Sequence, residues 1–118
     1  MIFDAGVFIA LDNPAQREII VALIERLRKQ NVTLHTTEAV LAQAWRDPAR
    51  QAPMARLVKT TTVLPVGDAK TIGVRCGQTD TSDVVDADLA IWSEVLGSTI
   101  LTTDPDDMDA LGARHVQL

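Results

Sequence analysis

The sequence predicts an α/β fold in which helices cover both faces of a mostly parallel sheet, a three-layer α/β/α sandwich. Short apolar runs typical of strands alternate along the chain with amphipathic segments of helical spacing. The 118 residues suffice for one hydrophobic core, and the hydrophobic content of 47% is ordinary for a folded protein. No repeat, low-complexity tract or linker divides the chain. We therefore expect one domain over residues 1–118, with right-handed connections between parallel strands.

In the first half of the chain, we expect a strand, two helices, a second strand and two more helices. Their positions are, in order, 1–4, 7–11, 19–29, 31–35, 40–45 and a short helix after Pro53. The helix at 19–29 has apolar residues at helical spacing and ends in Arg28 and Lys29, whose charges suit its negative pole. Thr36 or Thr37 is expected to cap the helix that follows the second strand.

In the second half, we expect a strand, two helices, a strand, a helix and a last strand. Their positions are, in order, 61–66, 68–75, 85–96, 99–102, 105–111 and 115–117, with a polar loop at 78–82. Apolar residues form one stripe along 85–96. Thr81 or Ser82 is expected to cap this helix, and Gly97 is expected to end it.

The formal charge of −5 hides a strong asymmetry between two parts of the chain. Every Lys and Arg except Arg114 lies between Arg17 and Arg75, whereas residues 76–113 contain only acidic charges. Crowding of like charges is unfavourable unless cations or solvent relieve it. An acidic surface with helix-capping aspartates is the alternative explanation. The net charge argues mildly against a simple electrostatic nucleic-acid binder, which usually has a basic face.

Several other functional classes lack their sequence signals. No basic stretch, cleavage site or uninterrupted apolar span marks the N-terminus, so we expect a cytoplasmic protein. Cys76 is the single cysteine and cannot form an internal disulfide or a zinc site. His35 and His115 have no ligand-like spacing, and neither a GxGxxG nor a GxxxxGK[ST] loop is present.

Four acids are expected at one end of the sheet, because ligands of such folds bind beyond the carboxyl ends of the strands. They are Asp4, Glu38, Asp86 and Asp104. Carboxylates are the ligands that Mg²⁺ or Mn²⁺ prefers, and a bound ion suits phosphodiester hydrolysis. The four residues are therefore the predicted metal ligands and catalytic acids.

Each acid also has another explanation. Asp4 could cap the next helix, and Glu38 could be a first-turn acid favoured by the helix dipole. Asp83 shares a helix face with Asp86, whereas Asp88 is expected to point elsewhere, into the acidic surface. Asp104 competes with two acids of the same turn, Asp106 and Asp107. Its position directly after the strand favours Asp104.

The segments IFDAGVFIAL, TTEAVLAQAWRD, TSDVVDADLA and ILTTDPDDM, in this order over nearly the whole chain, resemble those of PIN-domain ribonucleases. The resemblance is most specific to the VapC-like toxins of VapBC toxin and antitoxin pairs. It implies a Mg²⁺- or Mn²⁺-dependent endoribonuclease that cuts tRNA or ribosomal RNA, acts as a homodimer and is silenced by a VapB-like antitoxin. By the same resemblance, Asp4, Glu38, Asp86 and Asp104 hold the metal, with Thr102 or Thr103 supporting the site.

One departure and two rival functions remain. Many relatives have Ser, Thr or Asn after the first Asp, where this chain has Ala5 and Gly6, which removes a hydroxyl that could help hold the metal or its water. A receiver-like signalling domain would need paired acids after the first strand. A non-catalytic PIN scaffold that binds RNA or protein is the other alternative.

The expected RNA contacts are basic residues of the middle of the chain, Arg46, Arg50, Arg56 and Lys59.

Overall fold

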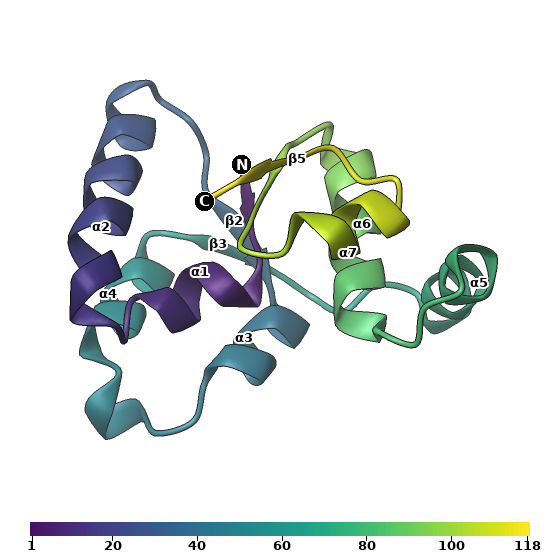
Figure 1. Ribbon diagram of the computed structural model, residues 1–118, viewed down its shortest axis with the longest axis horizontal. Helices are drawn as coiled ribbons and strands as arrows, with labels where there is room; N and C mark the ends of the chain where they lie inside the picture. Colours follow the sequence, from purple (N-terminus) through teal and green to yellow (C-terminus); the bar gives the residue numbers. More distant parts are fainter.

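The computed structural model describes residues 1–118 and has an α/β fold built on an all-parallel sheet (Figure 1). The sheet has five strands in the order β3-β2-β1-β4-β5. Their bounds are β1 Ile2–Phe3, β2 His35–Thr37, β3 Thr62–Leu64, β4 Ile100–Thr102 and β5 His115–Gln117. Each neighbouring pair is parallel, so all carboxyl ends meet at one edge. The predicted fold class is confirmed.

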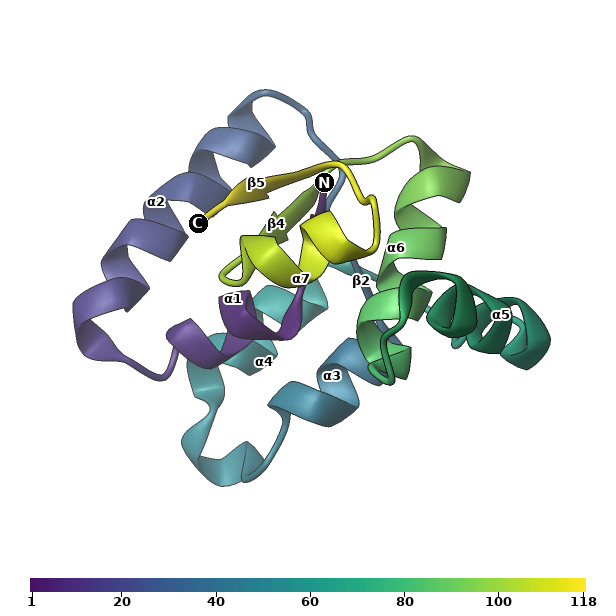
Figure 2. The same cartoon turned by 45° about the vertical axis from the view of Figure 1, so that its right-hand side comes forward.

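Helices connect every pair of consecutive strands. They are α1 Ala5–Ala10, α2 Pro14–Lys29, α3 Glu38–Ala44, the 3₁₀-helix η1 Pro48–Arg50, α4 Ala52–Lys59, α5 Ala69–Thr79, α6 Val84–Leu96 and α7 Pro105–Ala110. Figures 1 and 2 show α2 and α4 on one side of the sheet and α5 and α6 on the other. The sheet therefore lies between helical layers, as the alternating sequence pattern predicts.

The central strand β1 positions the first candidate acid. Ile2 and Phe3 are fully buried, and the ring of Phe3 packs edge to face on Phe8 of α1 with centroids 6.2 Å apart. Burying each of these large side chains contributes roughly 1.5–3 kcal/mol to folding. Because β1 lies between β2 and β4, Asp4 at its carboxyl end starts from the middle of the sheet.

In the first half, the structure moves one predicted strand and confirms one predicted helix cap. The strand expected at 31–35 is wrong, because β2 begins only at His35. The chain is still turning after α2: Asn31 has a φ of 58°, and the N–H of Val32 donates to the Leu27 carbonyl at 2.9 Å. The predicted cap Thr37 is confirmed, since its hydroxyl accepts from the N–H of Val40 at 3.1 Å.

The polar segment after the third strand also differs from its prediction. Helix α5 continues to Thr79 instead of ending at Arg75, and Asp80 ends it in the left-handed conformation. Within these last turns the hydroxyl of Thr79 donates to the Arg75 carbonyl at 2.8 Å. Asp83, rather than Thr81 or Ser82, caps α6.

The end of α6 agrees with its prediction. Gly97 ends the helix with a φ of 62°, a conformation that costs glycine little. None of the helices has the length and apolar run that a membrane-spanning segment needs.

Candidate active site

Asp4 is a buried carboxylate held by hydrogen bonds from two directions. It follows β1 and caps α1, with Oδ1 accepting from the N–H of Val7 at 3.3 Å. Its Oδ2 accepts from the hydroxyl of Thr102 at the end of β4. The N–H groups of Thr103 and Gly6 also face this carboxylate. Burial raises the pKa of Asp4, and these hydrogen bonds lower it by less. Asp4 is therefore a helix cap and also a fixed acid at the sheet edge.

Asp86 is the acid with the most strongly raised pKa. It lies in the first turn of α6, where its N–H donates to Oδ1 of the capping Asp83 at 3.0 Å. Burial is the largest cause of a pKa of about 7, followed by the charge and hydrogen bond of Asp83 and the charges of Asp107 and Asp4. A carboxyl group of this kind is protonated in a substantial fraction of molecules near neutral pH.

The turn after β4 and the first turn of α7 add further acids. Asp104 directly follows Thr103, and its N–H donates to the Thr102 hydroxyl at 2.9 Å. Loss of solvent raises the pKa of Asp107, and the charge and hydrogen bond of Asp104 raise it further, as do the charges of Asp83 and Asp106. We call Asp4, Asp83, Asp86, Asp104, Asp106 and Asp107 the acidic cluster, because electrostatic repulsion links them in one continuous series.

Glu38 is the predicted site residue that α3 carries. It is the first residue of that helix and is exposed. Its helix packs on α1 and α6, which carry Asp4 and Asp86 at or next to their first turns. The structure thus links Asp4 and Asp86 electrostatically, and Asp104 joins them through Asp107.

The cluster suits a metal in donor chemistry but not as a closed cage. Its donors are carboxylate oxygens, the ligand type of Mg²⁺ and Mn²⁺. No group of three or more His, Cys, Asp or Glu side chains converges closely enough to hold an ion. Mg²⁺ commonly uses only one or two carboxylates and completes its shell with waters and substrate phosphates. The residues present therefore fit an open site of that kind.

Asp88 corrects one prediction, because it does not belong to an acidic surface. It is 1% exposed, and its Oδ1 accepts from the N–H of Gly67 at 2.9 Å, while Oδ2 is buried without a partner. Burial raises the pKa of Asp88. The sequence could have predicted this burial from helical spacing. Asp88 lies three residues after Val85 and four before Trp92, on the packed stripe of α6. Asp88 therefore has a structural role, because its hydrogen bond holds the loop between β3 and α5 against α6.

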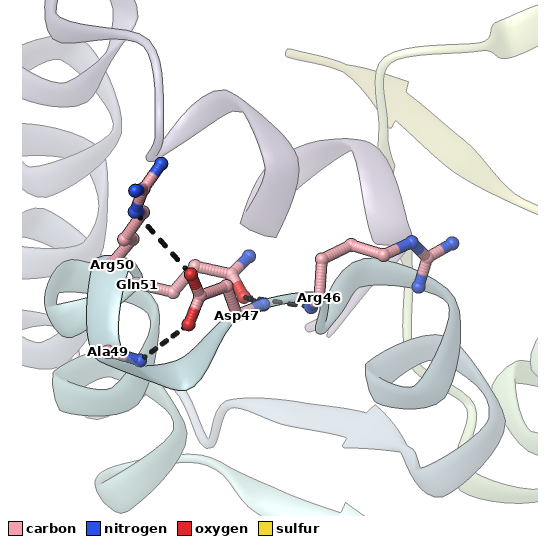
Figure 3. A network of polar contacts seen from close by, with 5 residues as sticks. All are labelled: Arg46, Asp47, Ala49, Arg50 and Gln51. Atoms are coloured by element: carbon pink, nitrogen blue, oxygen red, sulfur yellow. Dashed lines mark hydrogen bonds and ion pairs between the residues drawn. The ribbon is translucent and has the colours of Figure 1, made fainter.

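Two of the basic candidates lie in the connection between α3 and α4, which Gln51 organises (Figure 3). The buried Gln51 accepts at Oε1 from the N–H of Arg46 at 2.9 Å and from the N–H of Asp47 at 3.0 Å. Its Nε2 donates to Asp12 Oδ2 and to the Ala44 carbonyl, each at 3.1 Å. Arg50 Nε pairs with Asp47 Oδ2 at 3.5 Å. The backbone is therefore fixed, while the Arg46 and Arg50 side chains are exposed.

The basic candidates do not all line the same hollow. Arg46 and Arg50 line a pocket of about 430 Å³, and Asp12 lines the same pocket. Arg56 lines a separate groove of about 380 Å³ between α2 and α4, together with Arg17 and Arg28. Lys59 is exposed at the end of α4 and lines neither.

Comparison with solved structures finds the same fold over the whole chain. VapBC2 from Rickettsia felis, solved bound to a DNA fragment from their promoter, matches with a TM-score of 0.75 and 13% identity, over 100% of this chain and 99% of that chain. PAE2754 from Pyrobaculum aerophilum matches with a TM-score of 0.70 and 17% identity, over 98% and 82%. FitAcB from Neisseria gonorrhoeae matches with a TM-score of 0.66 and 12% identity, over 97% and 94%. No family model and no curated protein matches the sequence. Likeness at these identities shows a shared fold.

Proposed function

We propose that this chain, which has the fold of VapC-like PIN-domain toxins, is a divalent-metal-dependent endoribonuclease. The observation that supports it is that carboxylates from separate parts of the chain crowd at one sheet edge. Asp4 follows β1, Asp104 follows Thr103 after β4, and Asp86 lies in the first turn of α6 within range of the charge of Asp4. Such crowding costs folding free energy unless cations compensate it. The alternative is a binding module without catalysis, and an RNA cleavage assay distinguishes the two functions.

In the proposed mechanism, Asp4 and Asp86 hold the ion, with Asp104 and Glu38 as the further carboxylates of the site. A bound Mg²⁺ or Mn²⁺ supplies water activation and neutralises charge on the phosphodiester. Asp4 is oriented in advance, because Val7 and Thr102 fix both of its oxygens. Asp86 has a pKa of about 7 and can hold or release a proton at neutral pH when no cation is bound. Asp107 adds negative charge beside Asp104.

The biological role that we propose is that of a toxin neutralised by a cognate VapB-like antitoxin, with tRNA or ribosomal RNA as the substrate. Support for an antitoxin partner comes from the two-component assemblies VapBC2 and FitAB, which share this fold and were solved bound to DNA fragments. Support for a homodimer comes from exposed apolar side chains on the adjacent helices α5 and α6, Val74, Val95 and Leu96.

The test is cleavage of tRNA by the purified chain in Mn²⁺, in Mg²⁺ and in EDTA. We expect cleavage only with the divalent ions. Asp4→Asn and Asp86→Asn should abolish it, because the amide keeps the shape of the side chain but removes the charge that holds the ion. Glu38→Gln and Asp104→Asn should reduce cleavage by a similar or smaller factor.

Asp109→Asn is the matched control, because Asp109 is an exposed acid of α7 outside the acidic cluster. It should cut RNA like the parent chain, and circular dichroism should show all variants folded. Equal cleavage in EDTA, or an Asp4→Asn variant as fast as the parent, would refute the proposed function. RNA binding without any cleavage would favour the non-catalytic binding module instead.

A further inference from the structure

Gly6 and Thr103 pack against each other beside the buried Asp4. A β-carbon built on Gly6 would lie 1.8 Å from the hydroxyl oxygen of Thr103, 2.8 Å from its Cβ and 2.9 Å from its Cγ2. All three separations are shorter than non-bonded atoms tolerate. The Thr103 side chain thus occupies the space that any side chain at position 6 would need. The N–H groups of both residues face the Asp4 carboxylate, so this contact is part of the site.

The two neighbouring threonines use their hydroxyls differently. The Thr102 hydroxyl is fully engaged, since it donates to Asp4 Oδ2 and accepts from the N–H of Asp104. Thr103 is exposed, and its hydroxyl has no protein partner. A hydroxyl is an uncharged donor, and it stands here among carboxylates that repel any phosphate. Of these two hydroxyls, that of Thr103 alone remains free to donate to a ligand.

We propose that the Thr103 hydroxyl donates a hydrogen bond to a phosphodiester oxygen of the RNA, and that Gly6 is required because it leaves room for this side chain. The inference rests on the proposed nuclease function and adds a substrate-binding residue to it. A hydrogen bond to a charged oxygen is stronger than one between neutral groups. Its loss should lower kcat/KM by about tenfold or more.

The first experiment separates the hydroxyl from the shape of the side chain. Thr103→Val keeps the branched shape and removes the donor, whereas Thr103→Ser keeps the donor. We expect Thr103→Val to lower kcat/KM for an RNA oligonucleotide by about tenfold while circular dichroism shows it folded, and Thr103→Ser to stay within about twofold of the parent. Fluorescence anisotropy with Ca²⁺ in place of Mg²⁺ should show weaker RNA binding by Thr103→Val. A Thr103→Val variant that binds and cuts like the parent overturns the role of Thr103.

The second experiment moves the hydroxyl across the contact. Gly6→Ser alone should lower the unfolding midpoint and the cleavage rate, because the new side chain collides with Thr103. Gly6→Ser combined with Thr103→Gly should recover both, whereas Gly6→Ala combined with Thr103→Gly should recover only the midpoint. Gly73→Ala is the control, since a β-carbon there meets nothing within 4 Å. A Gly6→Ser variant as stable and active as the parent overturns the packing argument.

The two proposals fail in different ways. A parent chain that cuts no RNA with any divalent ion refutes the nuclease function and the role of Thr103 with it. A parent chain that cuts RNA alongside an equally active Thr103→Val variant refutes the role of Thr103 alone.

Discussion

The carboxyl group of Asp86 has lost part of its solvent and lies near Asp83, Asp107 and Asp4, and all of these effects raise its pKa. The folded pKa is about 7, against an ordinary value of 3.8. The folded chain therefore binds this proton more tightly than the unfolded chain does. The resulting stability is fully present below about pH 4 and is lost as the pH rises through about 7.

We predict that the metal-free chain loses stability between pH 5 and pH 8 and that Asp86→Asn removes much of this loss. The contribution of Asp86 should be on the order of 1–2 kcal/mol, less than the full shift implies, because solvent screens a half-exposed group. Urea unfolding in EDTA at both pH values measures it, with Glu18→Gln, at an exposed acid of α2, as the control. Identical pH profiles for the parent and Asp86→Asn would contradict the prediction.

At the scale of elements, α6 holds the loop between β3 and α5 through two side chains. Asp88 accepts from the N–H of Gly67 at 2.9 Å, and Trp92 Nε1 donates to the Pro65 carbonyl at 3.0 Å. A β-carbon on Gly67 would lie 2.9 Å from Asp88 Oδ1, so the loop approaches α6 closely. This pair of bonds fixes where β3 leads into α5.

We predict that Asp88→Ala lowers the free energy of unfolding by about 1–3 kcal/mol, because the partly buried Gly67 N–H loses its acceptor. Urea unfolding measures it at pH 8, where Glu18→Ala, at an exposed position of α2, should be nearly neutral. Asp88→Asn should be milder than Asp88→Ala, since the amide oxygen can still accept. An Asp88→Ala variant as stable as the parent would show that the loop is held by other contacts.

The connection from Arg46 to Gln51 is the element that presents basic side chains next to α3 (Figure 3). We predict that Arg46→Glu with Arg50→Glu weakens RNA binding, and that the loss shrinks as salt increases, because released counterions drive phosphate binding. Fluorescence anisotropy at several salt concentrations measures it. Lys70→Glu is the control, as an exposed charge of α5. Unchanged affinity at low salt would exclude this connection from the RNA interface.

Over the whole molecule, the acidic residues of the second half of the chain meet Asp4 at the carboxyl edge of the sheet, which folding alone brings about. The unfolded chain has no such cluster, so a cation that binds it stabilises the native state. We predict that millimolar Mn²⁺ raises the unfolding midpoint of the parent by several degrees and that of Asp4→Asn by much less. Differential scanning fluorimetry measures both. A midpoint that is unchanged by Mn²⁺ in the parent would exclude the metal site.

The sequence by itself determined the succession of strands and helices along the chain, the parallel sheet, the cap at Thr37, the end of α6 at Gly97 and the place of Asp4 directly after the first strand. These features depend on short-range causes: apolar periodicity, capping hydroxyls and the conformational range of glycine.

Only the tertiary structure decided which distant residues meet. It brought Asp107 beside Asp104 and within range of the charge of Asp83, and it buried Asp88 against Gly67. It also packed the side chain of Thr103 against Gly6. Each of these outcomes depends on how closely two segments far apart in the chain approach each other. That distance is set by side-chain packing over the whole core, and local sequence patterns do not contain it.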